Sequence, residues 1–357
     1  MFPFTKLSVE IFGESHADRI GVRIKNLPRG AVVDAAAVQA FVDERKAGKN
    51  PWSTPRNEPD VVLFTSGLEN GTITGDVTAV IKNTSQRSKD HDKLRFTPRP
   101  SHADYVATIK DGENVSLAGG GRFSGRMTAP LCIAGGIALQ LLEQKGVRIA
   151  SYVSEIGGVK GKSYSDADIS FEDVEKMKEN GCFALENTDK MVEKVLSARQ
   201  KGDSVGGSAE CIVFGAPVGL GDNLFNGLEG KISAAVFGIP AVKSVEFGLG
   251  RGFASACGSQ ANDPFCIKDG KVATVTNNNG GINGGISNGM PITLRATFKP
   301  TPSISLPQKT VDLQTMTETE IVIGGRHDAC IVPRAVPALK AAVALSILDA
   351  MSEENLI

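Results

Sequence analysis

The chain has 357 residues, of which 41% are apolar and 22% charged, a globular composition that can bury a sizeable core. Lys and Arg total 39 against 40 for Asp and Glu, so the formal net charge is −1. This balance argues against nucleic acid or an anionic membrane as the main partner, because both need a basic surface. Glycine is frequent, with 40 residues, which predicts many tight turns and places where the backbone approaches a ligand.

In chain order, the patterns predict a strand at 5–11, a helix at 34–47, strands at 60–65 and 77–82, a polar basic loop at 83–103, helices at 128–145 and 187–201, strands at 208–214, 242–247 and 290–298, and a helix at 335–351. Asp34 is expected to cap the first helix, with Val38, Phe41 and Val42 on one face. Because the order lacks a regular βαβ rhythm, we expect an α+β fold in layers and not a doubly wound parallel sheet.

Cysteine usage and hydropathy indicate the compartment. The cysteines stand at positions 132, 182, 211, 257, 266 and 330. No two form a CxxC pair, so we expect neither a zinc site nor a redox motif and interpret them as small buried residues. The N-terminal segment lacks the long apolar region of a signal peptide, and no stretch of about 18 uninterrupted apolar residues follows. These patterns predict a reduced, cytoplasmic location, no membrane span and no metal.

Two helix entries resemble each other. GGRFSGRMTAP leads into the predicted helix at 128–145, and GGRHDACIVPRAVP leads into that at 335–351. Each entry has Gly-Gly-Arg, then a short loop, then a strongly apolar helix. We interpret them as equivalent parts of two internally related halves, with chance similarity between glycine-rich helix entries as the alternative.

Two other glycine-rich segments imitate nucleotide-binding motifs. GGVKGKS at 157–163 has too few residues before Gly-Lys for a P-loop. GGGRFSG at 119–125 has a displaced third glycine and no βαβ unit around it, so it does not match a dinucleotide fingerprint. Turns explain both segments better.

Two histidines lie in turn-like segments that suit acid–base chemistry. His16 follows a predicted strand in GESHADRIG, and His102 follows the basic loop in RPSHAD. The unperturbed pKa of histidine is about 6.5 and the second pKa of a phosphate ester is about 6, so a histidine can supply a proton or positive charge to a leaving phosphate. Asp328, next to His327, can orient or deprotonate a neighbour. A purely structural loop histidine is the alternative for each.

Cationic side chains gather at loops rich in glycine or proline. The clusters are Arg87, Lys89, Lys93, Arg95 and Arg99 before His102; Arg45, Lys46, Lys49 and Arg56; Arg122 and Arg126 before one apolar helix; and Arg326 before the other. A helix N-terminus adds free N–H groups and a positive dipole. In a nearly neutral chain, this placement predicts a multiply anionic substrate or cofactor. Solvated loops are the alternative.

Two segments near the C-terminal end suit a flat, phosphorylated group. GGINGGISNGMP at 280–291 passes from glycines into a strand, which favours a bulky group pressed against the backbone. KPTPS at 299–303 offers a lysine and two hydroxyls for a phosphate tail. A plain loop is the alternative for each.

Together these segments resemble one family. FGESHADRIG, RSKDHDK with RPSHADY, GGGRFSGR, AVKSVEFGLG, GGINGGISNGMPI, KPTPS and GGRHDACIVPRAVP occur in the order and spacing of chorismate synthases, across essentially the whole chain. The resemblance implies a β-α-β sandwich with long central helices between antiparallel sheets. It also implies one domain over 1–357 with an internal pseudo-twofold repeat, assembled as a homotetramer.

The resemblance further implies a reaction: the 1,4-anti elimination of phosphate from 5-enolpyruvylshikimate 3-phosphate to give chorismate. Reduced FMN would be required without net redox. The flavin would be reduced either by the chain itself with NADPH or by a separate flavin reductase. A flavin-dependent oxidoreductase and a non-catalytic FMN-binding protein are alternatives that the same segments would suit.

Residue roles follow from the matching motifs. His16 would serve the leaving phosphate, His102 would protonate the reduced flavin, and Asp328 would help to take the substrate proton back through the flavin. The substrate would be held by Ser15, Arg45, Arg99 and Arg126. FMN would be held by Arg122, Phe123, Ser124, Pro240, Ala241, Gly284, Lys299, Pro300, Thr301, Pro302, Ser303 and Arg326.

Some positions depart from the commonest family pattern. Ala17 replaces a glycine, Phe123 a serine and Met127 a glutamate. Pro51 stands at a frequent arginine and Pro240 at a frequent asparagine. The flavin and phosphate contacts at these positions are therefore left open.

Overall fold

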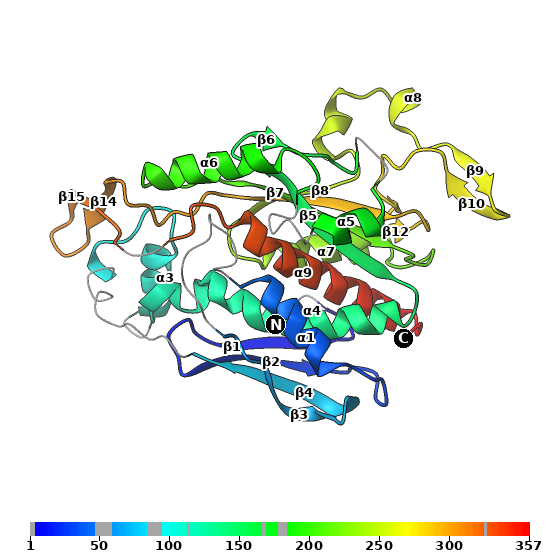
Figure 1. Cartoon of the computed structure of the whole chain (residues 1–357), viewed down its shortest axis with the longest axis horizontal. Coiled ribbons are helices and arrows are strands. Elements are labelled where there is room, and N and C mark those ends of the chain that lie inside the picture. Colours follow the sequence, from blue (N-terminus) through cyan, green and yellow to red (C-terminus); the bar gives the residue numbers. More distant parts are fainter. Residues whose placement is uncertain are drawn as a thin grey trace.

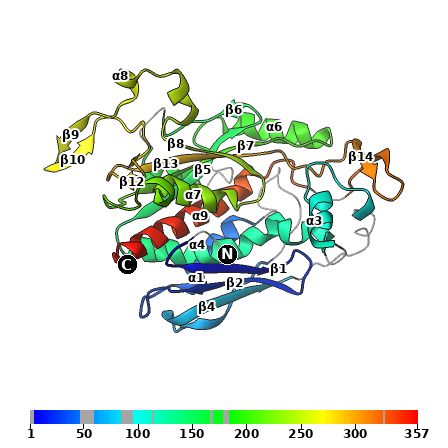
Figure 2. The same ribbon diagram turned by 180° about the vertical axis from the view of Figure 1, so that it is seen from behind.

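A computed structural model describes residues 4–46, 59–83, 95–112, 115–165, 169–177, 184–324 and 327–357. Two antiparallel sheets enclose a layer of helices, as Figure 1 shows and Figure 2 shows from behind. The α+β prediction and the β-α-β sandwich are therefore confirmed.

The first sheet has four strands in the order β1-β2-β4-β3. They span Ser8–Gly13 (β1), Arg19–Lys25 (β2), Leu63–Glu69 (β3) and Thr72–Lys82 (β4). The second sheet has five strands in the order β6-β5-β7-β13-β8. They span Arg148–Ile156 (β5), Val159–Lys160 (β6), Gly207–Phe214 (β7), Val242–Phe247 (β8) and Ile292–Phe298 (β13).

The helices between the sheets form the centre of the molecule. They are α1 (Ala35–Glu44), α4 (Thr128–Glu143), α7 (Leu228–Phe237) and α9 (Val332–Glu353). Asp34 caps α1 as predicted, accepting a hydrogen bond of 2.8 Å from the backbone N–H of Ala36. Side chains of β13 alternate between the two faces of the sheet, as in any strand. Ile292, Leu294 and Ala296 are buried on the face that packs against the helices.

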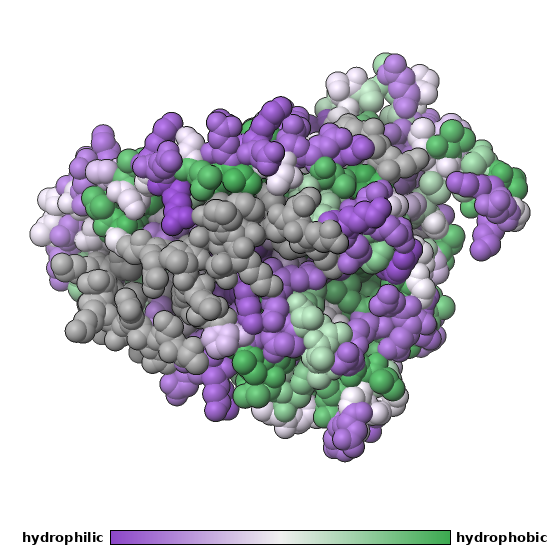
Figure 3. Space-filling model, viewed as in Figure 1, coloured by the Kyte–Doolittle hydropathy of each residue, from purple (hydrophilic) through white to green (hydrophobic). Residues whose placement is uncertain are grey.

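Smaller elements lie outside the sandwich. They are α3 (Asp104–Asp111), α5 (Phe171–Met177), α6 (Thr188–Gln200), α8 (Gly258–Ala261), and the hairpins β9 (Phe265–Lys268) with β10 (Lys271–Thr274), β11 (Ile282–Asn283) with β12 (Ile286–Ser287), and β14 (Gln308–Asp312) with β15 (Thr317–Ile321). α6 lies along the outside of the second sheet, where Figure 3 shows mostly hydrophilic residues at the surface.

The two sheets have the same topology. The order β1-β2-β4-β3 corresponds to β5-β7-β13-β8, and every neighbouring pair in both is antiparallel. In each half one helix, α1 or α7, lies between the second and third of these strands in chain order, and a long helix, α4 or α9, follows the fourth. This match agrees with the two related halves predicted from the helix entries.

α4 and α9 cross closely at the centre of the core. A Cβ added to Gly135 of α4 would lie 2.2 Å from the Cβ of Ala341 in α9, so only the absence of a side chain allows this approach. Two helical segments, Gly125–Glu143 and Val332–Glu353, are long and apolar enough to cross a membrane. However, 78% and 94% of their apolar stretches, respectively, are buried within the protein. They are core helices of the sandwich.

Some sequence-based predictions were wrong or incomplete. β2, β5 and α7 were not predicted. The first helix ends at Glu44, earlier than the predicted residue 47. Cys132, Cys211 and Cys330 are buried as expected, but Cys257 is exposed and Cys266 is half-exposed. Cys182 lies outside the described residues.

Candidate active site

His16 lies in the short turn between β1 and β2. The backbone N–H of Ser15 donates to the carbonyl oxygen of Gly121 at 3.3 Å, which joins this turn to the glycine-rich 3₁₀ segment Ala118–Phe123. A Cβ added to Gly119 would lie 2.2 Å from Cε1 of His16, so the imidazole ring packs directly against the backbone of that glycine. The GESH and GGGR motifs, far apart in sequence, therefore form one corner of the site.

Asn83 connects this corner to Arg126. Its amide nitrogen donates to the carbonyl oxygens of Ala17 at 2.6 Å and Glu14 at 3.3 Å. Its side-chain oxygen accepts from Nε of Arg126 at 3.2 Å and from Nη2 at 3.1 Å. The same amide thus orients both the histidine turn and the arginine.

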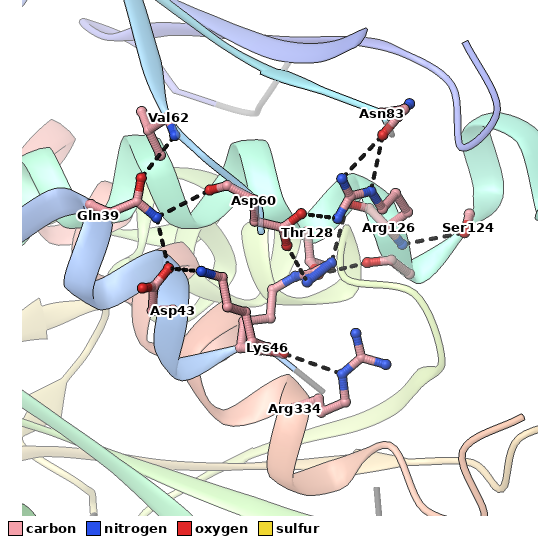
Figure 4. Close-up of polar contacts among 12 residues, drawn as sticks. Gln39, Asp43, Lys46, Asp60, Val62, Asn83, Ser124, Arg126, Thr128 and Arg334 are labelled. Atoms are coloured by element: carbon pink, nitrogen blue, oxygen red, sulfur yellow. Dashed lines mark hydrogen bonds and ion pairs between the residues drawn. The ribbon is translucent and has the colours of Figure 1, made fainter. Parts of the chain in front are cut away.

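Arg45 and Arg126 converge on the carboxylate of Asp60. Oδ1 of Asp60 pairs with Nη1 of Arg126, and Oδ2 lies 3.5 Å from Nη1 of Arg45. Figure 4 shows Asp60 and Asn83 on different sides of the Arg126 guanidinium. Arg45 also donates from Nε to the hydroxyl of Thr128 at 2.9 Å and from Nη2 to the carbonyl of Arg126 at 3.4 Å. The two predicted substrate arginines are therefore neighbours.

Arg334 connects this pair to Asp328. Its Nη1 pairs with Oδ2 of Asp328, and its Nε donates to the carbonyl oxygen of Arg45 at 3.2 Å. Burial lowers the pKa of Arg45 to about 10, and the positive charge of Arg334 acts in the same direction. Arg45 remains protonated at neutral pH, so the cluster keeps its positive charge.

His102 lies in a second part of the site, against KPTPS. Its Nε2 is 2.8 Å from the hydroxyl oxygen of Ser303. Arg99 makes a bidentate pair with Asp104, with both N–O distances at 2.7 Å. Burial, followed by the charge of Arg99, lowers the pKa of His102 to about 4. His102 is therefore neutral at pH 7, and an anion bound beside it would raise its pKa.

His327 adjoins this part and was given no role from sequence. Its Nε2 contacts the carbonyl oxygen of Gly324 at 3.2 Å. Burial is the main cause of a lowered pKa for His327, and its charged form would also lower the pKa of His102. Since His327 precedes Asp328 in the chain, it connects the two parts of the site.

The residues of KPTPS fit an anionic cofactor. The backbone N–H of Lys299 donates to the carbonyl oxygen of Ala241 at 3.0 Å, and its Nζ donates to the carbonyl oxygen of Ser101 at 2.6 Å. Oγ1 of Thr301 is buried, and no other described residue provides it with a hydrogen-bond partner. A buried hydroxyl in this state is suited to bind a ligand oxygen. Ala241, which follows Pro240 after the end of α7, is thus joined to the first residue of KPTPS.

Two other predicted cofactor residues, Gly284 and Arg122, have different surroundings. Gly285, the neighbour of Gly284, lies against Gly227 at the start of α7, whereas Pro240 follows the end of that helix. Arg122 pairs with Asp111 of α3 and stacks on Phe123 at 5.0 Å.

Ser124 has a structural contact of its own. The Ser124 hydroxyl accepts from the backbone N–H of Arg126 at 3.2 Å, so it caps a short helical turn. Arg326 and Pro51 lie outside the described residues.

Sequence reasoning missed several residues that hold the site together. They are Asp60, Asn83, Asp104, Thr128 and Arg334. Arg334 lies within the quoted motif GGRHDACIVPRAVP, so its proximity to Asp328 was a usable signal. Asp60 and Asn83 carry no local signal, because their partners are distant in sequence.

The comparisons with known proteins agree with this arrangement. The family model described as chorismate synthase matches residues 7–352. The chorismate synthase of Thermococcus kodakarensis is 45% identical over 344 residues, covering 96% of this chain and 95% of the relative. That of Dehalococcoides mccartyi (strain BAV1) is 44% identical over 339 residues, covering 95% and 93%. A crystal structure of a chorismate synthase shares the fold, with a TM-score of 0.78 at 24% identity, covering 98% of this chain and 93% of that one. The chain therefore belongs to the chorismate synthase family, a family of lyases.

Proposed function

We propose that this chain converts 5-enolpyruvylshikimate 3-phosphate to chorismate by a 1,4-anti elimination of phosphate, with reduced FMN and without net redox. The observation that carries the proposal is one series of contacts through the site. It runs from the His16 turn through Asn83, Arg126, Asp60, Arg45 and Arg334 to Asp328.

Arg45 and Arg126 would bind anionic groups of the substrate. Both guanidinium groups are buried and fixed by protein contacts, so they need little reorganisation when an anion arrives. A guanidinium has more N–H donors than the contacts of Arg45 with Thr128, Arg126 and Asp60 use among the described residues. These remaining donors can bind phosphate or carboxylate oxygens.

His16 would assist the departure of phosphate. Its ring is fixed against Gly119, and its turn is held by the same Asn83 that holds Arg126. A histidine fixed beside bound phosphate can donate a proton or a hydrogen bond to the leaving oxygen. Asp328, oriented by its ion pair with Arg334, would serve as a proton acceptor.

Reduced FMN, when bound, would supply reducing equivalents that it regains within each turnover, so that no net redox occurs. It would be held by Lys299, Thr301, Ser303 and Ala241. Lys299, which is hydrogen-bonded to Ala241, supplies a cation, Thr301 a buried hydroxyl that lacks a described partner, and Ser303 a hydroxyl bound to His102. A nearby anion would raise the pKa of His102 from about 4. His102 would then carry a proton beside the flavin.

The remaining expectations follow from the family. We propose a cytoplasmic homotetramer whose partner is a small phosphorylated anion, with neither nucleic acid nor membrane bound. Flavin reduction would use NADPH on the chain itself or a separate reductase. Light scattering of the purified protein and NADPH oxidation in the presence of FMN would test these points.

An anaerobic assay tests the proposed reaction. Purified protein is mixed with 5-enolpyruvylshikimate 3-phosphate and photoreduced FMN while chorismate, phosphate and the flavin spectrum are followed. We expect equal amounts of chorismate and phosphate, many turnovers per flavin, and flavin still reduced at the end. Consumption of one reduced flavin per product would indicate an oxidoreductase. Tight FMN binding with no phosphate release would indicate a binding protein.

A further inference from the structure

We propose that Asp60 is a positioning residue for substrate binding, whose carboxylate holds the guanidinium groups of Arg45 and Arg126 together so that both meet the same anionic substrate. This inference rests on the proposed function, since it takes those two arginines as substrate ligands. It adds a residue that acts through them and does not itself touch the substrate.

The geometry places one carboxylate oxygen on each arginine. Oδ1 of Asp60 pairs with Nη1 of Arg126, and Oδ2 faces Nη1 of Arg45 at 3.5 Å. The three residues are only 3%, 8% and 2% exposed, in the order Asp60, Arg126 and Arg45. Two buried guanidinium groups would repel each other without a counter-charge, and breaking such a buried set is costly. Asp60 therefore determines how close the two cations lie.

Among the described residues, neutral partners also contact each guanidinium group. Asn83 accepts from two nitrogens of Arg126, and Thr128 accepts from Nε of Arg45. Asp60 is the described carboxylate that contacts both arginines. These neutral contacts fix one side of each guanidinium group. Asp60 sets the orientation of the two groups relative to each other.

The backbone around Asp60 is itself held in an uncommon conformation. Its φ is +44°, a left-handed value that few residues other than glycine adopt. Gln39 of α1 holds the segment on either side: its amide nitrogen donates to the carbonyl oxygen of Asp60 at 3.1 Å, and its side-chain oxygen accepts from the N–H of Val62 at 2.8 Å. Figure 4 shows Gln39 between Asp60 and Val62. The position of the carboxylate is thus imposed by α1.

Positioning and mere charge neutralisation predict opposite effects on affinity. If Asp60 only offsets positive charge, its removal should leave a more cationic site that binds an anionic substrate more tightly. If it positions the arginines, its removal lets them separate and the substrate binds more weakly. The direction of the change in KM therefore distinguishes the two.

The test uses Asp60→Asn, which keeps the shape and removes the charge. We expect KM for the substrate to rise about 10- to 100-fold with kcat changed only a few-fold, and the Kd for oxidised FMN to stay unchanged. Asp76→Asn, the same substitution at an exposed position on β4, is the control and should leave every constant unchanged. A KM that stays constant or falls in Asp60→Asn would overturn the proposal.

Gln39→Leu covers the case in which Asp60→Asn does not fold. It removes the hydrogen bonds that hold the Asp60 segment and changes no charge. We expect KM to rise several-fold, and an unchanged KM in a folded Gln39→Leu protein contradicts the positioning role.

A binding measurement separates this proposal from the proposed function. Inorganic phosphate, without flavin, should raise the melting temperature of the wild-type protein more than that of Asp60→Asn or Gln39→Leu. If the wild type forms no chorismate, the proposed reaction fails, yet this difference still supports Asp60. If phosphate stabilises all three proteins equally, or none of them, the Asp60 proposal fails even where chorismate is formed.

Discussion

Nε2 of His102 lies 2.8 Å from the hydroxyl oxygen of Ser303, which follows it by 201 residues in the chain. This contact joins the PSHAD and KPTPS motifs at the predicted flavin end of the site. It also explains how a half-buried, neutral histidine keeps one ring orientation, because the hydroxyl can serve either tautomer as donor or acceptor.

Removing that hydroxyl should weaken catalysis and leave the fold intact. In Ser303→Ala the ring of His102 loses a hydrogen bond of about 1 kcal/mol, so we expect kcat in the anaerobic assay to fall roughly 5- to 10-fold. Ser305→Ala, at an exposed position in the same loop, serves as the control. Equal kcat values for the two variants would show that the contact has no part in turnover.

His102 should make stability depend on pH. Its pKa is about 4 in the folded protein against 6.5 for an unperturbed histidine, so the unfolded chain binds the extra proton first as the pH falls. Folding is therefore unaffected by this group above pH 6.5 and is progressively destabilised toward pH 4. Because water screens the exposed part of the ring, we expect a loss of about 2 kcal/mol at most.

Urea unfolding at pH 7 and pH 5 of the wild type and His102→Asn measures this effect. The wild type should lose more stability between the two pH values than the variant does. If both proteins lose the same free energy of unfolding, His102 has the same pKa in the folded and the unfolded protein, which contradicts this prediction.

Gly119 should be essential for the position of His16. Alanine there would place its Cβ 2.2 Å from the imidazole, at a φ of +56°. We expect about a 100-fold loss of kcat/KM, as for other displacements of a catalytic group by about 1 Å. Gly120→Ala is a matched control, because its φ is +89° but its nearest neighbour, Cβ of Ser124, is 3.4 Å away. Activities that fall equally in both variants would point to backbone strain alone.

Arg334 should act through Asp328. Arg334→Gln removes the ion pair that orients the carboxylate of Asp328, so we expect kcat to fall about 10- to 100-fold. In a double-mutant cycle with Asp328→Asn, the second substitution should cost little once the first is present. Fully additive losses would mean that Arg334 works independently, through Arg45.

The helix crossing gives a test of the fold itself. Gly135→Ala would force its Cβ to within 2.2 Å of Ala341, and such overpacking costs about 2–3 kcal/mol. Gly136→Ala, whose nearest neighbours lie at 3.4 Å, should be neutral or stabilise α4 by up to about 1 kcal/mol. Thermal unfolding of both variants measures the difference, and a stable Gly135→Ala protein would show that α4 and α9 lie further apart.

Much of the fold was predictable because the relevant signals are local. The apolar helices α4 and α9 and the alternating strand β13 follow from the sequence pattern. β5 was missed because it is buried on both faces, between α9 and α5, and such strands show no alternation. The strand β2 contains Gly21, which weakens a strand signal.

The site was predictable only where motifs carried it. His16, His102, Arg126 and Asp328 were found by their motifs and Arg45 by its basic cluster, and one series of contacts links all of them except His102, which contacts Ser303. Asp60 stands 66 residues from Arg126, so the pairing depends on folding and leaves no pattern in the sequence. Gly284 also comes from a motif, and its role in flavin binding stays a prediction: its neighbour Gly285 lies against Gly227 at the start of α7, whereas Pro240 follows the end of that helix.

A crystal structure with oxidised FMN and 5-enolpyruvylshikimate 3-phosphate tests most directly whether these residues form one active site. We expect substrate oxygens within hydrogen-bond distance of Arg45 and Arg126, the phosphate beside His16, and the flavin against His102 and the segment 299–303. Ligands bound elsewhere, with these side chains still pairing only among themselves, would contradict the proposed site and the reaction built on it.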